Sequence, residues 1–149
     1  MQGIRWVQMS VDERNAFLGR GGTGVIAFAE GLEAPPFTIP VSYGYDAEDE
    51  SFYYRLAFPP SNAKSGVVER QVTFVAYGET EAGWQSVVAA GRLEDLSGAP
   101  YESSAVQKLW AVQIPDVDIF DRPREEIPFR EYRLVPERIT GRKEVKREV

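Results

Sequence analysis

The segment Arg55-Leu-Ala-Phe-Pro-Pro-Ser-Asn-Ala-Lys64 combines the residue types that hold a phosphate group. A strand pattern stops at the two prolines, and Ser61 and Asn62 are typical of a helix start. Free main-chain amides at a helix start attract an anion, Lys64 would add a compact charge one turn later, and Arg55 would add a planar fork. The segment therefore predicts a site for a phosphate monoester. The alternative is a solvated helix that carries an ordinary surface lysine.

A second candidate is the run from Trp84 to Glu94, whose centre is apolar on both faces. Trp84 and Ser86 lie on one face because strand side chains alternate. Gly91 permits a close backbone approach or a bulge. The pattern predicts burial inside a barrel or in an interface, and core packing is the alternative role for the large side chains.

The glycines of Gly19-x-Gly21-x-x-Gly24 match a dinucleotide-binding pattern in residue type and spacing but not in structural context. That site needs a strand before the glycines and a helix after them. Here a helix pattern over Val11–Leu18, with Ser10 and Glu13 as a capping box, comes first. The glycines instead indicate a helix C-cap and a tight entry into a strand.

The composition removes several classes of site. The 149 residues contain neither cysteine nor histidine, which excludes thiol chemistry, a Ser-His-Asp triad and histidine-ligated zinc or haem. Asp116, Asp118 and Asp121 lack the spacing of a calcium loop, so we expect no metal.

The formal net charge is −6, which does not favour a nucleic-acid binder. Thirteen arginines against four lysines, in an acidic chain, suggest a halophilic, high-salt source, and repulsion within the acidic turn Asp46–Glu50 predicts greater stability at molar salt. No apolar run is long enough to span a membrane, and the start resembles no signal peptide, so a cytoplasmic location is expected.

The elements that must position these residues are mostly strands, and we treat residues 1–149 as one domain. Six strands are predicted, and they are Gly24–Ala29, Phe37–Tyr45, Ser51–Phe58, Gln71–Tyr77, Trp84–Leu96 and Phe129–Thr140. Two further helices are predicted over Asn62–Glu69 and Pro100–Ala111, and the charged tail Arg142–Val149 is expected to be frayed. Short strands joined by hairpin turns predict a mainly β, antiparallel barrel.

The order of several motifs resembles the pyridoxamine 5′-phosphate oxidase-like family, and in particular its short haloarchaeal flavin-nucleotide-binding members. The motifs are Gly22-Thr-Gly-Val-Ile-Ala27, Pro40-Val-Ser-Tyr-Gly-Tyr45, Phe52-Tyr-Tyr-Arg-Leu56, Ser61-x-x-Lys64, Val72-Thr-Phe-Val75, Trp84-x-Ser-Val87 and Gly91-Arg-Leu93. The resemblance covers roughly residues 10 to 96, with a weaker match over Arg133–Arg142. It implies a six-stranded split barrel that forms a homodimer and binds FMN between the subunits.

The resemblance also implies which residues meet the cofactor. Those beside the isoalloxazine ring are Val41, Ser42 and Tyr43; those at the phosphate are Arg55, Leu56, Ser61, Asn62 and Lys64; those that approach from the partner subunit are Trp84, Ser86 and Val87. The family often has an adjacent Arg-Lys pair at the phosphate. Here Ala63 precedes Lys64, so the second cation must be Arg55 or come from elsewhere.

Two classes of function follow from the resemblance. One is a flavin-dependent oxidoreductase that acts on a small substrate, since the flavin itself carries the hydride and no side-chain acid or base is needed. The other is a non-catalytic FMN-binding module for storage, delivery or sensing. A deazaflavin or haem barrel is a third alternative. Oxidation of vitamin B6 is not expected, because full-length oxidases grip that substrate with arginine and histidine in a C-terminal portion.

The homodimer has support from the residues as well. In Trp84–Leu96, Val87 and Ala89 lie on one face while Val88 and Ala90 lie on the other, so both faces need cover. A second copy of the chain would supply that cover.

Overall fold

The computed structural model describes residues 3–57, 67–97, 103–111 and 129–147. The strands are β1 (Gly3–Gln8), β2 (Gly21–Phe28), β3 (Phe37–Asp46), β4 (Ser51–Leu56), β5 (Val72–Thr80), β6 (Gly83–Gly91), β7 (Leu93–Asp95), β8 (Arg130–Leu134) and β9 (Arg138–Arg147). The helices are α1 (Val11–Leu18) and α2 (Ser104–Ala111). The predicted phosphate-binding helix start at Ser61 and the cluster Asp116, Asp118 and Asp121 lie outside these residues.

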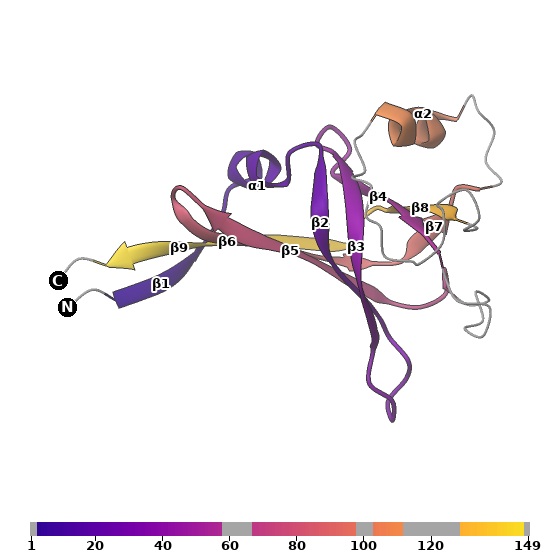
Figure 1. Cartoon of the computed structure of the whole chain (residues 1–149), viewed down its shortest axis with the longest axis horizontal. Coiled ribbons are helices and arrows are strands. Elements are labelled where there is room, and N and C mark those ends of the chain that lie inside the picture. The colour runs from indigo at the N-terminus through magenta and orange to yellow at the C-terminus, as the bar shows by residue number, and fades with distance from the viewer. Residues whose placement is uncertain (1–2, 58–66, 98–102, 112–128, 148–149) are drawn as a thin grey trace, which may run out of the picture.

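The strands form one antiparallel sheet in the order β1-β9-β6-β5-β2-β3-β4-β8-β7. The sheet curls into a half-barrel, with α1 and α2 lying along one side of it (Figure 1). The mainly β, split-barrel architecture is therefore confirmed. The predicted number of strands is wrong, because the described residues form nine rather than six.

The difference arises partly where one predicted strand is two. The run Trp84–Leu96 ends as β6 at Gly91 and restarts as β7 at Leu93, which pairs with β8 instead. A Cβ at Gly91 would lie 3.2 Å from Leu134 Cδ1 and 3.3 Å from the Val135 carbonyl oxygen, so the chain turns in close contact with its neighbour. Phe129–Thr140 likewise divides into β8 and β9 around Pro136.

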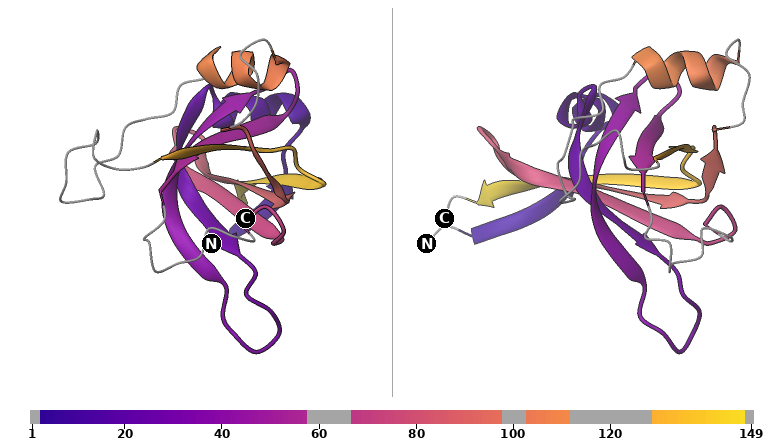
Figure 2. Two further views of the ribbon diagram at one scale, coloured as in Figure 1. Left: turned by 90° about the vertical axis from the view of Figure 1, so that its right-hand side faces the viewer. Right: turned by 45° about the vertical axis from the view of Figure 1, so that its right-hand side comes forward.

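The remaining new strand joins the two ends of the chain. β1 pairs with the second half of β9 from Gly3↔Arg147 to Gln8↔Arg142, so the charged tail, expected to be frayed, is in a strand as far as Arg147. This two-stranded ribbon projects from the half-barrel (Figures 1 and 2). A strand rich in Arg, Lys and Glu has no apolar alternation, which explains why the pattern did not predict it.

The concave face of the sheet holds the core. Its largest rings are Tyr43, Phe52, Phe74 and Tyr54, and Phe74 makes ring contacts with the other three at 5.2 to 5.3 Å between centroids. Alternation then sends the intervening side chains, such as Ser42, to the convex face. We call these the inner and outer faces of the sheet.

Helix α1 is capped and docked as the sequence predicts. Ser10 and Glu13 form the capping box, and Gly19 ends the helix with a positive φ of 59°. Two core tyrosines reach its last turn: the Tyr45 hydroxyl donates to Asn15 Oδ1 at 2.6 Å, and the Tyr43 hydroxyl donates to the Leu18 carbonyl. Neither helix of the described chain is long and apolar enough to cross a membrane.

Candidate functional site: the split between two strands

The two strands β3 and β4 separate soon after their shared turn. Their pairing covers only Gly44↔Tyr53 to Asp46↔Ser51, although β3 begins at Phe37 and β4 continues to Leu56. From there β3 follows β2, while β4 turns away with β8 (Figure 1). Within the described chain, no strand pairs with this edge of β3 over residues 37–43. Its main-chain donors and acceptors are thus available to a ligand.

Ser42 and Arg55 lie on the two sides of this split. Each is two residues beyond the Gly44↔Tyr53 pair, so both side chains belong to the outer face. The Ser42 hydroxyl oxygen is buried and has no hydrogen-bond partner among the residues that the structure describes. A buried hydroxyl without a partner is costly, and a ligand with a polar edge would satisfy it.

The neighbours of Ser42 on β3 face the core. Val41 is buried, and Tyr43 has its ring among the inner-face aromatics and its hydroxyl 3.0 Å from the Leu18 carbonyl oxygen. Burial raises the pKa of the Tyr43 phenol to about 12. Of these three predicted ring contacts, only Ser42 has a side chain on the ligand side; Val41 and Tyr43 can contribute main-chain groups alone.

Arg55, the predicted phosphate fork, has a carboxylate neighbour. Its Nε lies 3.4 Å from Glu131 Oε1, across the β4–β8 pair, and both side chains are about one-third exposed. Only Nε takes part in this pair, at the long end of the hydrogen-bond range, and no other described residue pairs with the terminal nitrogens. Leu56, the next predicted contact, is buried on the inner face. Ser61, Asn62 and Lys64 lie outside the described residues.

The predicted contacts on β6 divide between the two faces. Trp84 is exposed and Ser86 is half-buried on the outer face, whereas Val87 is fully buried in the core. Val87 could therefore meet a ligand only through its main chain. Trp84 also stacks on Tyr77, with ring centroids 6.2 Å apart.

An apolar patch occupies the outer face of β2, β5 and β6. Its members are joined by register: Val25 pairs with Val75, and Val75 with Val88, while Ala27 and Ala90 flank Thr73. Val88 is 36% exposed, and the other four are half-buried. We call Val25, Ala27, Val75, Val88 and Ala90 the outer patch.

Helix α2 contacts the β3–β4 turn through one lysine. Its Lys108 lies 2.9 Å from Asp46 Oδ2 and also pairs with Asp49 in the β3–β4 turn, and these bonds raise the pKa of the lysine. Burial raises the pKa of the Tyr53 phenol. The positive charges of Arg133 and, more weakly, of Lys108 partly oppose that rise. Arg14 pairs with Glu50 at 2.6 Å. Two cations, Lys108 and Arg14, thus pair with carboxylates of the acidic turn, which holds four carboxylates in all.

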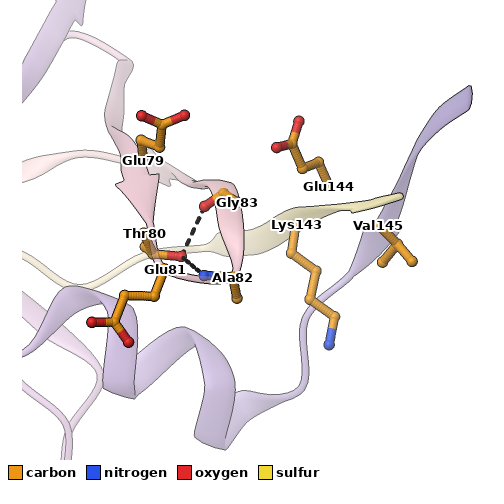
Figure 3. Close-up of a pocket in the computed structure, with 8 residues that line it drawn as sticks. All are labelled: Glu79, Thr80, Glu81, Ala82, Gly83, Lys143, Glu144 and Val145. Carbon is orange, nitrogen blue, oxygen red and sulfur yellow. Dashed lines mark hydrogen bonds between the residues drawn. The ribbon is translucent and has the colours of Figure 1, made fainter. Parts of the chain in front are cut away.

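A pocket of about 510 Å³ lies elsewhere, between the β5–β6 turn and β9 (Figure 3). It is lined by Glu79, Thr80, Glu81, Ala82, Gly83, Lys143, Glu144 and Val145. None of the predicted cofactor contacts lines it, and its three carboxylates would repel a phosphate. We do not assign it to a flavin. Within the described part of the chain, no group of three or more carboxylates is arranged to hold a metal ion.

Three residues of the outer face were not found from the sequence: Glu131 beside Arg55, Tyr77 beside Trp84, and Arg142, which the β6–β9 register places opposite Ser86. Alternation alone predicts that each lies on one face of its strand. Only the strand order places them beside the predicted residues, and no local signal fixes that order.

Comparison with known proteins decides the family. A family profile described as pyridoxamine 5′-phosphate oxidase matches residues 10–143, which is most of the chain. The chain belongs to the pyridoxamine 5′-phosphate oxidase family. A search of curated proteins finds no significant match.

Solved structures agree with this family at the level of the fold. An FAD-binding protein from Mesorhizobium loti aligns with a TM-score of 0.62 at 19% identity, over 96% of this chain and 99% of the other. The FAD binding protein from Mycobacterium smegmatis gives 0.66 at 14% identity, over 95% and 100%. An FAD and heme binding protein from the same organism gives 0.58 at 9% identity, over 95% and 72%. The family's split-barrel fold is thus shared with proteins that bind flavin dinucleotides.

Proposed function

We propose that the protein binds FMN with its ring system along the open edge of β3, at the split from β4. The observation that carries the proposal is the buried, unpartnered hydroxyl of Ser42 beside that edge. The polar edge of a flavin ring alternates hydrogen-bond donors and acceptors, which suits a free strand edge. Membership of the family and the FAD-binding structural neighbours support the same assignment.

The residues around the split suggest how each part of FMN is held. Ser42 and the main chain of Val41 and Tyr43 orient the ring, and Arg55 meets the phosphate together with the segment that contains Ser61, Asn62 and Lys64. Trp84 and Ser86, and the main chain of Val87, belong to the subunit opposite. When bound, the flavin supplies hydride or electron transfer, so the chain itself needs no histidine or cysteine.

A homodimer is the second part of the proposal. The outer patch presents branched and small apolar side chains on the outer face, and a second copy would bury them. Such interfaces commonly bury about 2,000 Å² or more. Light scattering is expected to give about twice 16.7 kDa for the wild type, and Val88→Glu is expected to lose dimer and FMN together. A monomer that keeps full FMN affinity would refute this part.

Ser42→Ala tests the ring assignment. Loss of one hydrogen bond of this kind predicts FMN and riboflavin binding weakened by about two- to tenfold, equally for both because the ring is shared. The matched control is Thr38→Ala, which changes an exposed hydroxyl on the same strand and face, about 13 Å away. If Ser42→Ala leaves the affinity for both flavins unchanged, the flavin ring does not bind at this edge of β3.

For the reaction class, we propose a flavin-dependent oxidoreductase with a small substrate. Reduction of the bound flavin by NADH or NADPH under anaerobic conditions, followed by reoxidation with an added acceptor, would support it. A flavin that binds stoichiometrically but is reduced by neither nucleotide would favour the non-catalytic module. Because the family's usual B6 substrate is gripped by histidine that this chain lacks, pyridoxamine 5′-phosphate is not the expected substrate.

A further inference from the structure

The stacked rings of Tyr77 and Trp84 form a flat, accessible surface at the end of the β5–β6 hairpin. Their planes are 26° apart, with centroids separated by 6.2 Å. Both rings remain open to solvent, at 62% for Tyr77 and 40% for Trp84. That spacing is too small to admit a third ring between them, so a flat ligand would lie on an outer face of the pair.

This aromatic surface is held in place by its own turn. The Thr80 hydroxyl donates to the Gly83 carbonyl at 2.8 Å and accepts the Ala82 N–H at 3.2 Å (Figure 3). The Trp84 N–H donates to Glu144 Oε1 at 3.1 Å, which ties the hairpin to β9. A ligand would therefore find the rings already arranged, and little ordering cost would be added on binding.

The charges around the rings are arranged with opposite signs on two sides. On the side of the turn, Glu79 pairs with Trp84 in register, and the Glu144 carboxylate accepts the Trp84 N–H. One row further from the turn, Ser86 pairs with both Tyr77 and Arg142. The Arg142 side chain is exposed and forms no hydrogen bond or ion pair within the described chain. An anionic group attached to a ring on this surface would thus point away from the turn and toward Arg142.

The same row leads to the proposed flavin site. Val25 pairs with Val75, and this register, continued two residues further along the antiparallel strands, places Thr23 at the level of Tyr77. Thr23 in turn pairs with Ser42. Tyr77, Thr23 and Ser42 are therefore at one level of the outer face. Two strand spacings, or about 10 Å, separate Tyr77 from Ser42.

We propose that Tyr77, Trp84 and Arg142 form a subsite for an adenosine phosphate, with the adenine on the two rings and the phosphate at Arg142. The inference rests on the proposed flavin site, because the adenosine half of a flavin dinucleotide is the expected source. A separate adenosine phosphate, such as that of a nicotinamide dinucleotide, would share the same chemistry.

The test compares FAD with FMN on dimeric protein. Replacing one stacking ring, in Tyr77→Leu, is expected to weaken FAD about tenfold or more while FMN changes less than about twofold. Tyr77→Phe, which keeps the ring, should retain FAD. Trp6→Leu is the matched control, since Trp6 is 53% exposed on the same outer face and has no stacking partner in the described chain. Arg142→Gln should also weaken FAD selectively, and Arg5→Gln, on the opposite face of the ribbon, should not.

Titration of ADP into the FMN-loaded protein separates the two sources. ADP that binds to wild type, is lost in Tyr77→Leu and is displaced by FAD supports the dinucleotide. ADP that binds and is lost in Tyr77→Leu, while FAD and FMN affinities stay equal, supports a separate nucleotide at the subsite. The inference would be overturned if Tyr77→Leu and Arg142→Gln both leave ADP binding and the ratio of FAD to FMN affinity unchanged. If wild type binds neither flavin, the proposed function fails, and ADP binding alone then decides the subsite.

Discussion

The Tyr43 hydroxyl donates a 3.0 Å hydrogen bond to the main-chain carbonyl of Leu18, the last residue of α1. The phenol is therefore fixed by the helix on the inner side of β3. The next side chain along the strand, Ser42, points to the other face with its hydroxyl unpartnered. One strand thus anchors the fold with one residue and offers a polar group to a ligand with the adjacent one.

Tyr43→Phe separates these two roles. Removal of the hydroxyl leaves the Leu18 carbonyl without this donor, and we expect the free energy of unfolding to fall by about 1 kcal/mol. FMN affinity should remain within about twofold of wild type, because the hydroxyl faces away from the split. Urea unfolding and flavin titration measure the two effects. A large loss of FMN affinity with unchanged stability would place the hydroxyl in the cofactor site instead.

Stability should fall at alkaline pH. Burial raises the pKa of Tyr43 to about 12, and burial together with Glu50 raises that of Tyr45 to about 12, whereas an unfolded tyrosine ionises near pH 10. The unfolded chain then loses protons first, so the stabilisation is complete below about pH 10 and is lost as pH rises toward 12. Urea unfolding across this interval should show the decline, with a shallower slope in Tyr43→Phe. A stability that is flat over this range in wild type would contradict the buried phenols.

Glu131 should compete with the phosphate for Arg55. Arg55→Gln is expected to weaken FMN about tenfold or more with little change for riboflavin, since a charge-assisted contact to the phosphate is lost. Lys64→Ala should behave in the same way. Glu131→Gln should strengthen FMN, because it removes the competing carboxylate 3.4 Å from Arg55 Nε. Glu94→Gln, whose carboxylate pairs with Arg133, is the control. Equal effects on FMN and riboflavin in Arg55→Gln would show that Arg55 does not meet the phosphate.

Salt should act on the contact between α2 and the acidic turn. Lys108→Gln removes the cation that Asp46 and Asp49 share, so the melting temperature should fall at low salt. The gap from wild type should narrow from about 0.1 to about 1 M KCl, as the screening length falls from about 10 to about 3 Å. Wild type itself should gain stability at molar salt, because screening relieves the repulsion that accompanies its net charge of −6. A gap that is the same at both salt concentrations would mean that the lysine acts by packing rather than by charge.

The sequence predicted the elements whose patterns are local. Helix Val11–Leu18 has the predicted bounds because its capping box and terminal glycine lie within its own turns. The central strands β2 to β5 follow their apolar alternation to within about three residues. The close backbone approach expected at Gly91 is present, but the sequence did not show that the strand ends there.

What the sequence missed depends on pairings between distant segments. The ribbon of β1 and β9 joins the two ends of the chain, and its charged residues carry no strand pattern. The candidate site also depends on pairings between segments that are distant in the sequence. Ser42 and Arg55 were named, yet the carboxylate of Glu131 reaches Arg55 only through the β4–β8 pair, which links residues 76 positions apart. That pairing gives Arg55 a carboxylate neighbour, which the motif alone did not predict.

The measurement that tests the central claim most directly is equilibrium dialysis of the purified protein against FMN, with the bound flavin quantified by its absorbance. The account predicts saturable binding of one FMN per chain, competition by riboflavin through the shared ring, and weakened binding in Ser42→Ala. Absence of saturable flavin binding in a folded protein, or binding that Ser42→Ala and Arg55→Gln leave unchanged, would contradict a flavin site at the split of β3 and β4.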